Sequence, residues 1–348
     1  MKSRYIVFPA KQEVAVWEEA VEEPGPDELL CKADKSLIST GTEGSCLRGI
    51  FEAGTNWEAM VQYPFRPGYS MAAQVIAAGE GVQSIQVGDR VAAWAAHQEY
   101  FKLRPEDAHP IPEGVSSEEA TWSILACTTQ LGVRRAELVL GETVAVVGLG
   151  ILGQLVVQYL ALSGARRIIA IDPLEERLEL AAGHGATHCL AMPVQETIGK
   201  VEAITGGRML DALFEISGHP DVLAHCLPLM RRLGRIVLLG DTPTPSQQHL
   251  GPGLVSNSVA ILGIHGTMMP EHSTVFNPWT AQEMAGLFFD YLLQGRMRVD
   301  DLITHRVSPL QAPEVYPQLL REKGQALGVI FDWQRLSQGR GKAEISPA

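Results

Sequence analysis

Three glycines with the spacing Gly-x-Gly-x-x-Gly, at Gly148, Gly150 and Gly153, are the strongest chemical signal in this chain. They follow an apolar strand-like run at 144–147 and open a helix-like run. In that context Gly148 permits a tight turn, Gly150 lets the backbone approach a pyrophosphate, and Gly153 lets helix and strand pack closely. The helix N-terminus offers free N–H groups and its positive dipole end to phosphates. The motif therefore predicts a dinucleotide site that also includes Leu149, Ile151 and Leu152.

An acidic residue follows the motif at the distance typical of such sites. Asp172 lies about twenty residues after the last glycine, at the end of the next apolar strand, where its carboxylate can accept hydrogen bonds from ribose hydroxyls. The same carboxylate would repel a 2′-phosphate, so the sequence favours NAD over NADP. Arg177, also predicted to contact the cofactor, and Arg166 weigh in the opposite direction. The alternative is a glycine turn that only packs a β-α-β unit and binds nothing.

The elements that must position these residues change in character along the chain. From about residue 118, helix-like runs alternate with apolar strand-like runs at 144–147, 168–171, 212–214, 236–239 and 259–262. Strands that are apolar on both faces and separated by helices indicate a parallel sheet covered on both sides. The first hundred or so residues contain short strand-like runs and Gly or Pro turns, at 5–8, 72–77, 79–81 and 87–91. That pattern is typical of an antiparallel, partly open barrel.

The C-terminal part returns to the first pattern. After Gly295 come a strand-like run at 302–307, a helix at 312–321 and a strand at 327–331, which we interpret as rejoining the first domain. The sequence thus predicts an α/β protein with two domains and a tail. The predicted boundaries are 1–122 completed by 296–335, a dinucleotide-binding domain at 123–295, and a flexible tail at 336–348.

Charge and composition exclude several classes of function. The formal charge of −12 opposes binding to nucleic acid, so we expect a small-molecule substrate. Five cysteines, never paired as CxxC, argue against a disulfide framework and a zinc ribbon. The uncharged stretch 143–165 is long enough to span a bilayer, but its glycines and glutamines favour a strand, a turn and a helix. With no secretory signal at the start, we expect a cytoplasmic protein with no membrane partner.

Two further motifs carry a family resemblance. Gly88–Val91 and Gly234–Gly240, together with the glycine motif, resemble the zinc-type alcohol dehydrogenase-like superfamily of medium-chain dehydrogenases/reductases. The resemblance implies a GroES-like β-barrel domain followed by an inserted Rossmann domain, a doubly wound parallel sheet, and NAD(P)-dependent oxidoreductase activity. More narrowly, Ile38–Glu43 and Pro67–Ser70 resemble the branch that includes bacteriochlorophyllide hydroxyethyl dehydrogenase.

The resemblance also shows where zinc ligands are expected. Thr40 stands where zinc-dependent relatives have a cysteine, and Tyr69 stands where they have a histidine. Only Cys127 matches the third ligand, and the cysteine-rich lobe for structural zinc is missing. Catalytic zinc needs three protein ligands and an open position, so we predict no metal. An alternative site built from Cys127, His97 and Glu43 is conceivable.

Without zinc, hydroxyl groups must stabilise the reacting oxygen. Tyr69 is the first candidate for a hydrogen-bond donor or acid, with Thr42, where the family has its proton-relay hydroxyl, and Thr40 beside it. His97 is a candidate for proton transfer and Glu43 for a base that holds Thr42 or Tyr69. The alternatives are a tyrosine that packs a cleft wall, a structural histidine and a solvated surface acid.

The remaining predicted cofactor contacts come from a helix and from strand ends. The helix-like run at Cys127 places Thr128 or Thr129 near the nicotinamide, unless these threonines only cap the helix. The carboxyl ends of later strands, where open α/β sheets bind ligands, contribute Ser217, Gly240 and His265.

Three functions fit these residues. The first is a zinc-free, NAD-dependent alcohol or carbonyl oxidoreductase, and the second is an enone or quinone reductase. The third is a dinucleotide-binding sensor that has lost catalysis. The edge strand at 259–262 also predicts a homodimer.

Overall fold

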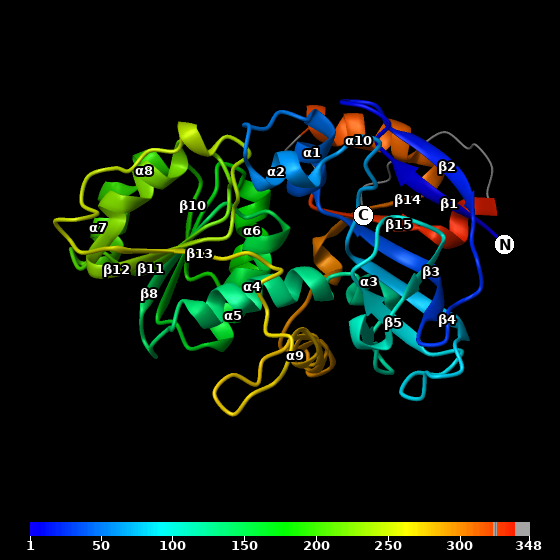
Figure 1. Cartoon of the computed structure of the whole chain (residues 1–348). Helices are drawn as coiled ribbons and strands as arrows, with labels where there is room; N and C mark the ends of the chain where they lie inside the picture. Colours follow the sequence, from blue (N-terminus) through cyan, green and yellow to red (C-terminus); the bar gives the residue numbers. More distant parts are fainter. Residues whose placement is uncertain (323, 325, 338–348) are drawn as a thin grey trace. The chain divides into compact units, whose positions relative to one another are not determined.

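The computed structural model describes residues 1–322, 324 and 326–337. These residues form two compact units, one from Met1–Ile124 together with the chain from Ala285 onward, and one from Leu125–Met284 (Figure 1). The sequence-based boundaries were 122/123 and 295/296. Of the predicted tail, residues 338–348 lie outside the described residues, whereas Trp333–Ser337 form a 3-10 helix.

The second unit is built on a parallel sheet with strand order β10-β9-β8-β11-β12-β13. Its strands are β8 (Thr143–Val147), β9 (Arg167–Ile171), β10 (His188–Leu190), β11 (Leu210–Glu215), β12 (Met230–Leu238) and β13 (Ala260–Gly263). The predicted parallel sheet is confirmed, with β10 added. Because β9 and β11 flank β8 on opposite sides, the order reverses at β8, the point where open α/β sheets bind ligands.

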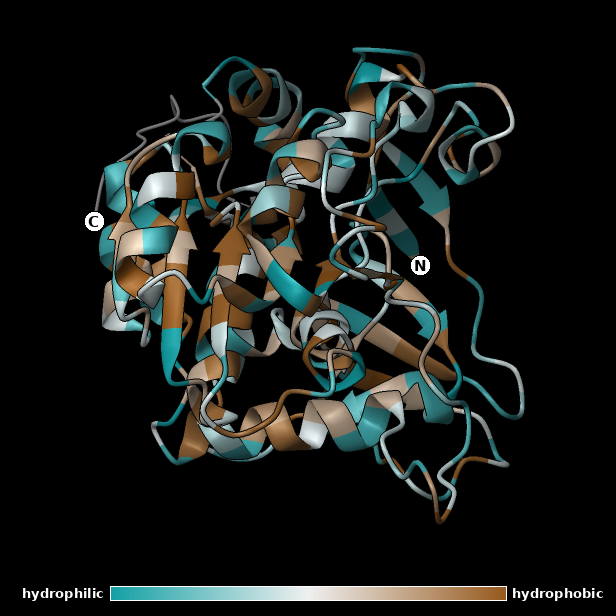
Figure 2. Ribbon diagram, turned by 90° about the vertical axis from the view of Figure 1, so that its left-hand side faces the viewer, coloured by the Kyte–Doolittle hydropathy of each residue, from teal (hydrophilic) through white to brown (hydrophobic). Residues whose placement is uncertain are grey.

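Helices connect and cover these strands. They are α4 (Ser123–Arg135), α5 (Ile151–Leu162), α6 (Glu175–Gly183), α7 (Ile198–Thr205) and α8 (Val222–Cys226). Figure 1 shows α7 and α8 on one side of the sheet and α6 on the other. The central strands β8, β9 and β11 are mostly buried, and Figure 2 shows brown, apolar strands in this sheet, as expected where both faces are covered.

The first unit contains a largely antiparallel sheet with strand order β14-β15-β3-β4-β5-β7, with β6 paired to β3. The strands are β3 (Leu29–Ile38), β4 (Met71–Ala78), β5 (Arg90–Ala93), β6 (Tyr100–Leu103), β7 (Ala108–Pro110), β14 (Ile303–Val307) and β15 (Gly328–Asp332). A separate pair joins β1 (Lys2–Val7) and β2 (Ala15–Ala20). Because β15 pairs with β3, the C-terminal segment completes the first sheet.

Four helices lie entirely within the described part of this unit: α1 (Thr40–Arg48), α2 (Asn56–Met60), α3 (Ser117–Ala120) and α10 (Ala312–Arg321). Most of α9 (Ala281–Leu293), from Ala285 onward, also belongs to it. Helix α1 follows β3 after the single residue Ser39, so the end of the longest strand determines where the helix starts. The core beneath includes Phe8, Tyr316 and Phe331.

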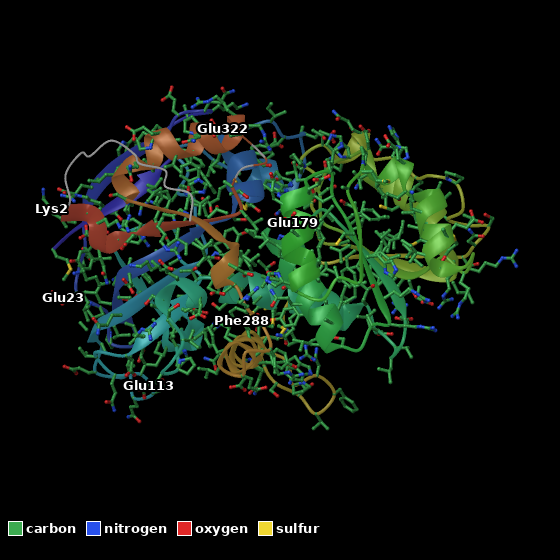
Figure 3. The ribbon with its side chains drawn as sticks, turned by 180° about the vertical axis from the view of Figure 1, so that it is seen from behind. Lys2, Glu23, Glu113, Glu179, Phe288 and Glu322 are labelled. Carbon is green, nitrogen blue, oxygen red and sulfur yellow. The ribbon has the colours of Figure 1, made fainter. Side chains whose placement is uncertain are left out.

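Most charged side chains lie on the surface, and most large apolar side chains lie in the interior. The labelled charged residues Lys2, Glu23, Glu113, Glu179 and Glu322 are all exposed, whereas Phe288 is fully buried (Figure 3). The uncharged stretch 143–165 forms β8, the glycine motif and α5. Within the described ranges, no helix has both the length and the apolar character needed to cross a bilayer. All five cysteines are free, and only Cys189 is exposed.

Candidate active site

The glycine turn, residues 148–150, joins β8 to α5. Gly148 has φ of +91°, and a Cβ there would lie 3.1 Å from the Ser217 nitrogen. A Cβ on Gly153 would lie 2.1 Å from the Gly148 carbonyl oxygen, so both positions exclude a side chain. Gly150 is the N-cap of α5, and a Cβ there would meet nothing within 4 Å. The helix N-terminus is therefore uncovered, which fits an anionic ligand.

The residues between the glycines contribute backbone rather than side chains. Leu149 and Ile151 are buried, whereas Leu152 is partly buried. Their N–H groups belong to the turn and first turn of α5, where groups without an intrahelical partner occur.

Asp172 is tied directly to the glycine turn. Its Oδ2 accepts a hydrogen bond from the Leu149 N–H at 2.8 Å, and its Oδ1 accepts one from the Leu174 N–H at 3.0 Å. The Arg177 guanidinium lies 3.8 Å from Oδ2, and the Arg177 carbonyl accepts a hydrogen bond from Gln154. The carboxylate thus holds the turn, and since each carboxylate oxygen has two acceptor sites, it retains acceptor capacity for a ligand.

The next two strand ends pack against the glycine turn. Glu215, the last residue of β11, accepts hydrogen bonds from the Ser217 N–H at 2.7 Å and from the Ser217 hydroxyl. A Cβ on Gly240, after β12, would lie 2.4 Å from the Gly218 nitrogen. Ser217 and Gly240 are therefore brought to the same edge as Gly148.

Two other predicted contacts differ in their surroundings. His265 is bonded to the Thr267 hydroxyl at 2.7 Å, and a Cβ on Gly266 would lie 2.5 Å from Thr128 Oγ1, so Thr128 adjoins this loop. Thr129 is fully buried and donates to the carbonyl oxygens of Leu125 and Ala126 in its own helix. The interpretation of Thr129 as a cofactor contact is corrected, because its hydroxyl is used inside α4. Nor do the threonines cap that helix, which begins at Ser123.

In the first unit, three side chains form what we call the hydroxyl cluster: Ser39, Thr42 and Tyr69. The Tyr69 hydroxyl donates to Ser39 Oγ at 2.6 Å and also interacts with the Thr42 hydroxyl. Burial raises the pKa of Tyr69 to about 12, against a smaller opposing effect of the two hydroxyls. The Tyr69 ring stacks on Trp94 with ring centroids 4.9 Å apart. The cluster thus presents a protonated phenol in a fixed orientation. Thr40 begins α1 and is partly buried.

Behind the hydroxyl cluster lies a buried network centred on Glu43. Its Oε1 accepts from the Ser39 N–H at 2.8 Å, and its Oε2 is bonded to His97 Nε2 at 3.1 Å and to the Tyr316 hydroxyl. His97 Nδ1 lies 2.8 Å from Ser36 Oγ. Because His97 is 0% exposed and both its nitrogens are bonded, it is a positioning residue in place of the proton-transfer residue expected above. Glu43 likewise positions the backbone of Ser39.

Sequence reasoning did not find Ser39, Ser36, Tyr316 or Glu215. The only local signal is the adjacency of Ser39 to Thr40. The others are connected through long-range hydrogen bonds, such as that from Tyr316 to Glu43, 273 residues apart.

Two family models match the chain. The alcohol dehydrogenase GroES-like domain matches residues 32–123, and the zinc-binding dehydrogenase model matches residues 152–281. The D-guloside 3-dehydrogenase of Escherichia coli K12 is 28% identical over 275 residues, which are 77% of this chain and 78% of the relative. The sorbitol dehydrogenase of Bacillus subtilis is 26% identical over 340 residues, covering 87% of this chain and 90% of the relative.

The fold agrees with solved structures. An alcohol dehydrogenase from Escherichia coli CFT073, complexed with NADH, has a TM-score of 0.79 at 21% identity and covers 95% of this chain and 99% of that chain. The chain belongs to the zinc-type alcohol dehydrogenase-like superfamily of medium-chain dehydrogenases/reductases. It is an oxidoreductase of that superfamily, with the predicted GroES-like domain and Rossmann sheet.

The family model implies zinc, and the residues present do not fit it. Tyr69, at one expected ligand position, stays a neutral phenol at neutral pH, and Thr40 offers only a hydroxyl. Burial raises the pKa of Cys127 to about 12, and its thiol donates to the Ala281 carbonyl at 3.5 Å. In the part of the chain that the structure describes, no three His, Cys, Asp or Glu side chains could together hold a metal ion.

Proposed function

We propose that this chain interconverts an alcohol and a carbonyl compound by hydride transfer with NAD(H), without a catalytic zinc. The observation that carries the proposal is the hydrogen bond from Tyr69 to Ser39, with Thr42 beside it. By the resemblance, Tyr69 stands at one zinc-ligand position of the superfamily and Thr42 at the position of its proton relay. A catalyst for this reaction must stabilise the oxygen that gains or loses a proton while hydride moves. Three convergent hydroxyls supply hydrogen-bond donors for that oxygen.

The glycine turn and its surroundings fit a dinucleotide. The open position at Gly150 and the N-terminus of α5 would hold the pyrophosphate, and Asp172 would accept hydrogen bonds from the adenosine ribose. When bound, the nicotinamide ring supplies or accepts the hydride. The fold alone does not choose between cofactors, since solved relatives include one with NADH and one with NADP. We assign NAD because the Asp172 carboxylate, partly offset by Arg177, opposes a 2′-phosphate.

In carbonyl reduction, Tyr69 donates its hydrogen bond to the substrate oxygen and then its proton. The single phenolic hydrogen now points to Ser39, so it must turn toward the substrate while the Ser39 hydroxyl turns to donate to the phenol oxygen. The rotation keeps the hydrogen bond between the two hydroxyls and only reverses its direction, because each hydroxyl can donate and accept. The reverse sequence serves alcohol oxidation. Glu43 keeps Ser39 in place through the backbone N–H.

The names of the relatives support an alcohol substrate. One is a D-guloside 3-dehydrogenase and another a sorbitol dehydrogenase. The narrower resemblance of Ile38–Glu43 and Pro67–Ser70 to the bacteriochlorophyllide hydroxyethyl dehydrogenase branch points to the same group of reactions, and it rests on those residues alone.

The proposal is tested with purified protein in two measurements. Elemental analysis gives the zinc content per chain, and NADH absorbance is followed with a panel of alcohols, aldehydes, ketones, enones and quinones, with and without a chelator. We expect turnover of an alcohol or carbonyl compound that is insensitive to the chelator, with zinc well below one atom per chain.

Each other outcome points elsewhere. Stoichiometric zinc that is needed for activity overturns the zinc-free mechanism. Turnover confined to enones or quinones identifies a reductase that delivers hydride to carbon. Tight NADH binding without turnover of any substrate identifies a sensor.

A further inference from the structure

Glu215 is a buried acid that the proposed reaction does not use. It ends β11, between β8 and β12 in the parallel sheet, and it is 0% exposed. Its Oε1 accepts from the Ser217 N–H at 2.7 Å and from the Ser217 hydroxyl. Its Oε2 is buried and has no hydrogen-bond partner among the described residues. A buried orphan oxygen is costly, so its presence calls for a reason.

The backbone of the same residue connects to the next strand end. The Glu215 carbonyl accepts hydrogen bonds from the Leu239 N–H at 3.0 Å and from the Gly240 N–H at 3.1 Å. The following residue donates from the Ile216 N–H to the Val147 carbonyl at 3.0 Å. One position thus joins the carboxyl ends of β8, β11 and β12.

The loops at these three ends are packed backbone against backbone. A Cβ on Gly148 would lie 3.1 Å from the Ser217 nitrogen, and one on Gly240 would lie 2.4 Å from the Gly218 nitrogen. Gly218 has φ of +62°. With no side chain between the loops, a shift of Ser217 is transmitted directly to the glycine turn.

Within the described segments, Glu215 is not half of a structural ion pair. Among the described residues, no lysine, arginine or histidine forms an ion pair with it. Burial raises the pKa of its carboxyl, and this effect outweighs the opposing effect of the hydrogen bonds from Ser217. A carboxyl that takes up a proton more readily repels a neighbouring pyrophosphate less than an ordinary glutamate does.

We propose that Glu215 is a positioning residue for the dinucleotide, whose oxygen acceptor holds the Ser217 loop against the glycine turn. The inference rests on the proposed dinucleotide function. Glu215 itself does not contact the ligand in this proposal. Its side chain matters because one of its oxygens accepts from the Ser217 N–H, and neither its negative charge nor its volume is required for NADH binding.

Asp211 provides a matched control on the same strand. It lies on β11 four residues before Glu215, and its carboxylate accepts from the Thr143 N–H at 2.8 Å and from Arg231 at 2.5 Å. Loss of either acid removes a hydrogen bond to backbone and lowers stability, but only Glu215 lies next to the loops at the ligand-binding edge.

The experiment measures the NADH dissociation constant by fluorescence, and the melting temperature, for the parent chain and for Glu215→Leu, Glu215→Met, Glu215→Gln and Asp211→Leu. We expect about tenfold weaker NADH binding in Glu215→Leu and Glu215→Met, the size of one lost hydrogen bond. We expect Glu215→Gln to stay within about twofold of the parent, because its amide oxygen still accepts from Ser217. Asp211→Leu is expected to lose melting temperature and keep its NADH affinity.

Parent-like binding in Glu215→Leu or Glu215→Met overturns the inference, as does equal weakening in Asp211→Leu or in Glu215→Gln. If Glu215→Leu does not fold, Glu215→Met carries the comparison, because methionine keeps the length of the side chain and lacks the carboxyl oxygen that accepts from Ser217. Failure of the parent to bind any nicotinamide dinucleotide contradicts the proposed function itself and is therefore distinguishable from failure of this inference.

Discussion

The phenolic hydroxyl of Tyr69 donates a hydrogen bond of 2.6 Å to the hydroxyl of Ser39, which precedes it by 30 residues. The bond joins the loop before β4 to the N-cap of α1. The Ser39 backbone is in turn held by the buried Glu43. The Tyr69 hydroxyl, which the sequence predicts to be catalytic, is therefore held in place by the start of helix α1.

Replacing Tyr69 with phenylalanine tests the donor role. The ring can still stack on Trp94, while the donor to the substrate oxygen is lost, so we expect kcat to fall by about 100- to 1000-fold with little change in NADH affinity. Steady-state kinetics with the substrate found in the panel measures this. Tyr63→Phe is the matched control, since Tyr63 donates only to the Cys46 carbonyl. Activity close to that of the parent in Tyr69→Phe would exclude the phenol as donor.

The raised pKa of Tyr69 predicts a pH dependence of stability. Because the folded-state pKa is about 12 and the ordinary value is 10, the folded chain binds the phenolic proton more tightly than the unfolded chain. This contribution is fully present below pH 10 and is lost as pH rises toward 12. Urea unfolding of the parent should therefore show falling stability over this range, with a smaller fall in Tyr69→Phe. Identical slopes would mean that the phenol titrates normally.

Asp172 is predicted to set the cofactor preference. Asp172→Ser removes the negative charge that opposes a 2′-phosphate and that offsets the nearby charge of Arg177, so we expect kcat/KM with NADP to rise at least about tenfold relative to NAD. The exposed Glu175, in the first turn of α6, serves as the control because Glu175→Ser alters local charge without touching the glycine turn. An unchanged ratio in Asp172→Ser, or an equal change in both variants, counts against the assignment.

The edge strand β13 predicts a homodimer. It pairs only with β12 in the described sheet, which leaves its other edge available to a second copy. Light scattering should give twice the chain mass of 37.8 kDa. Ala260→Asp places like charges near each other if the strand pairs with its own copy, and should shift the mass toward the monomer. The exposed Leu140→Asp, in the same unit, should leave the mass unchanged. A monomeric parent would contradict this prediction.

The sequence was sufficient for the fold and for the glycine turn at the edge of the sheet where we propose that the dinucleotide binds. Apolar strands alternating with helices, together with the glycine spacing around Gly148, depend on local patterns, and those patterns carry most of the information about a parallel sheet. The three-residue strand β10, His188–Leu190, has no such pattern, because its first two residues are partly or fully exposed.

The supporting residues could not be predicted, because their roles arise from contacts between distant segments. Ser39 acquires its role from Tyr69, and Glu215 from the packing of three strand ends that only the sheet brings together. Thr129 shows the converse, since its position beside Thr128 suggested a ligand contact, while the phase of α4 turns its hydroxyl into the helix.

The pairing of β15 with β3 has a consequence for how the protein is made. Glu43 accepts a hydrogen bond from the Tyr316 hydroxyl, and Ser36 accepts one from the Trp333 indole N–H at 2.9 Å. Residues near the N-terminus therefore depend on donors that are synthesised nearly three hundred codons later. When the N-terminal segment leaves the ribosome, β3 therefore lacks its neighbour β15, and the Glu43 carboxylate lacks the hydrogen bond from Tyr316. The parallel-sheet unit is synthesised in full before β15, so it can fold first. The unit that contains the hydroxyl cluster folds last.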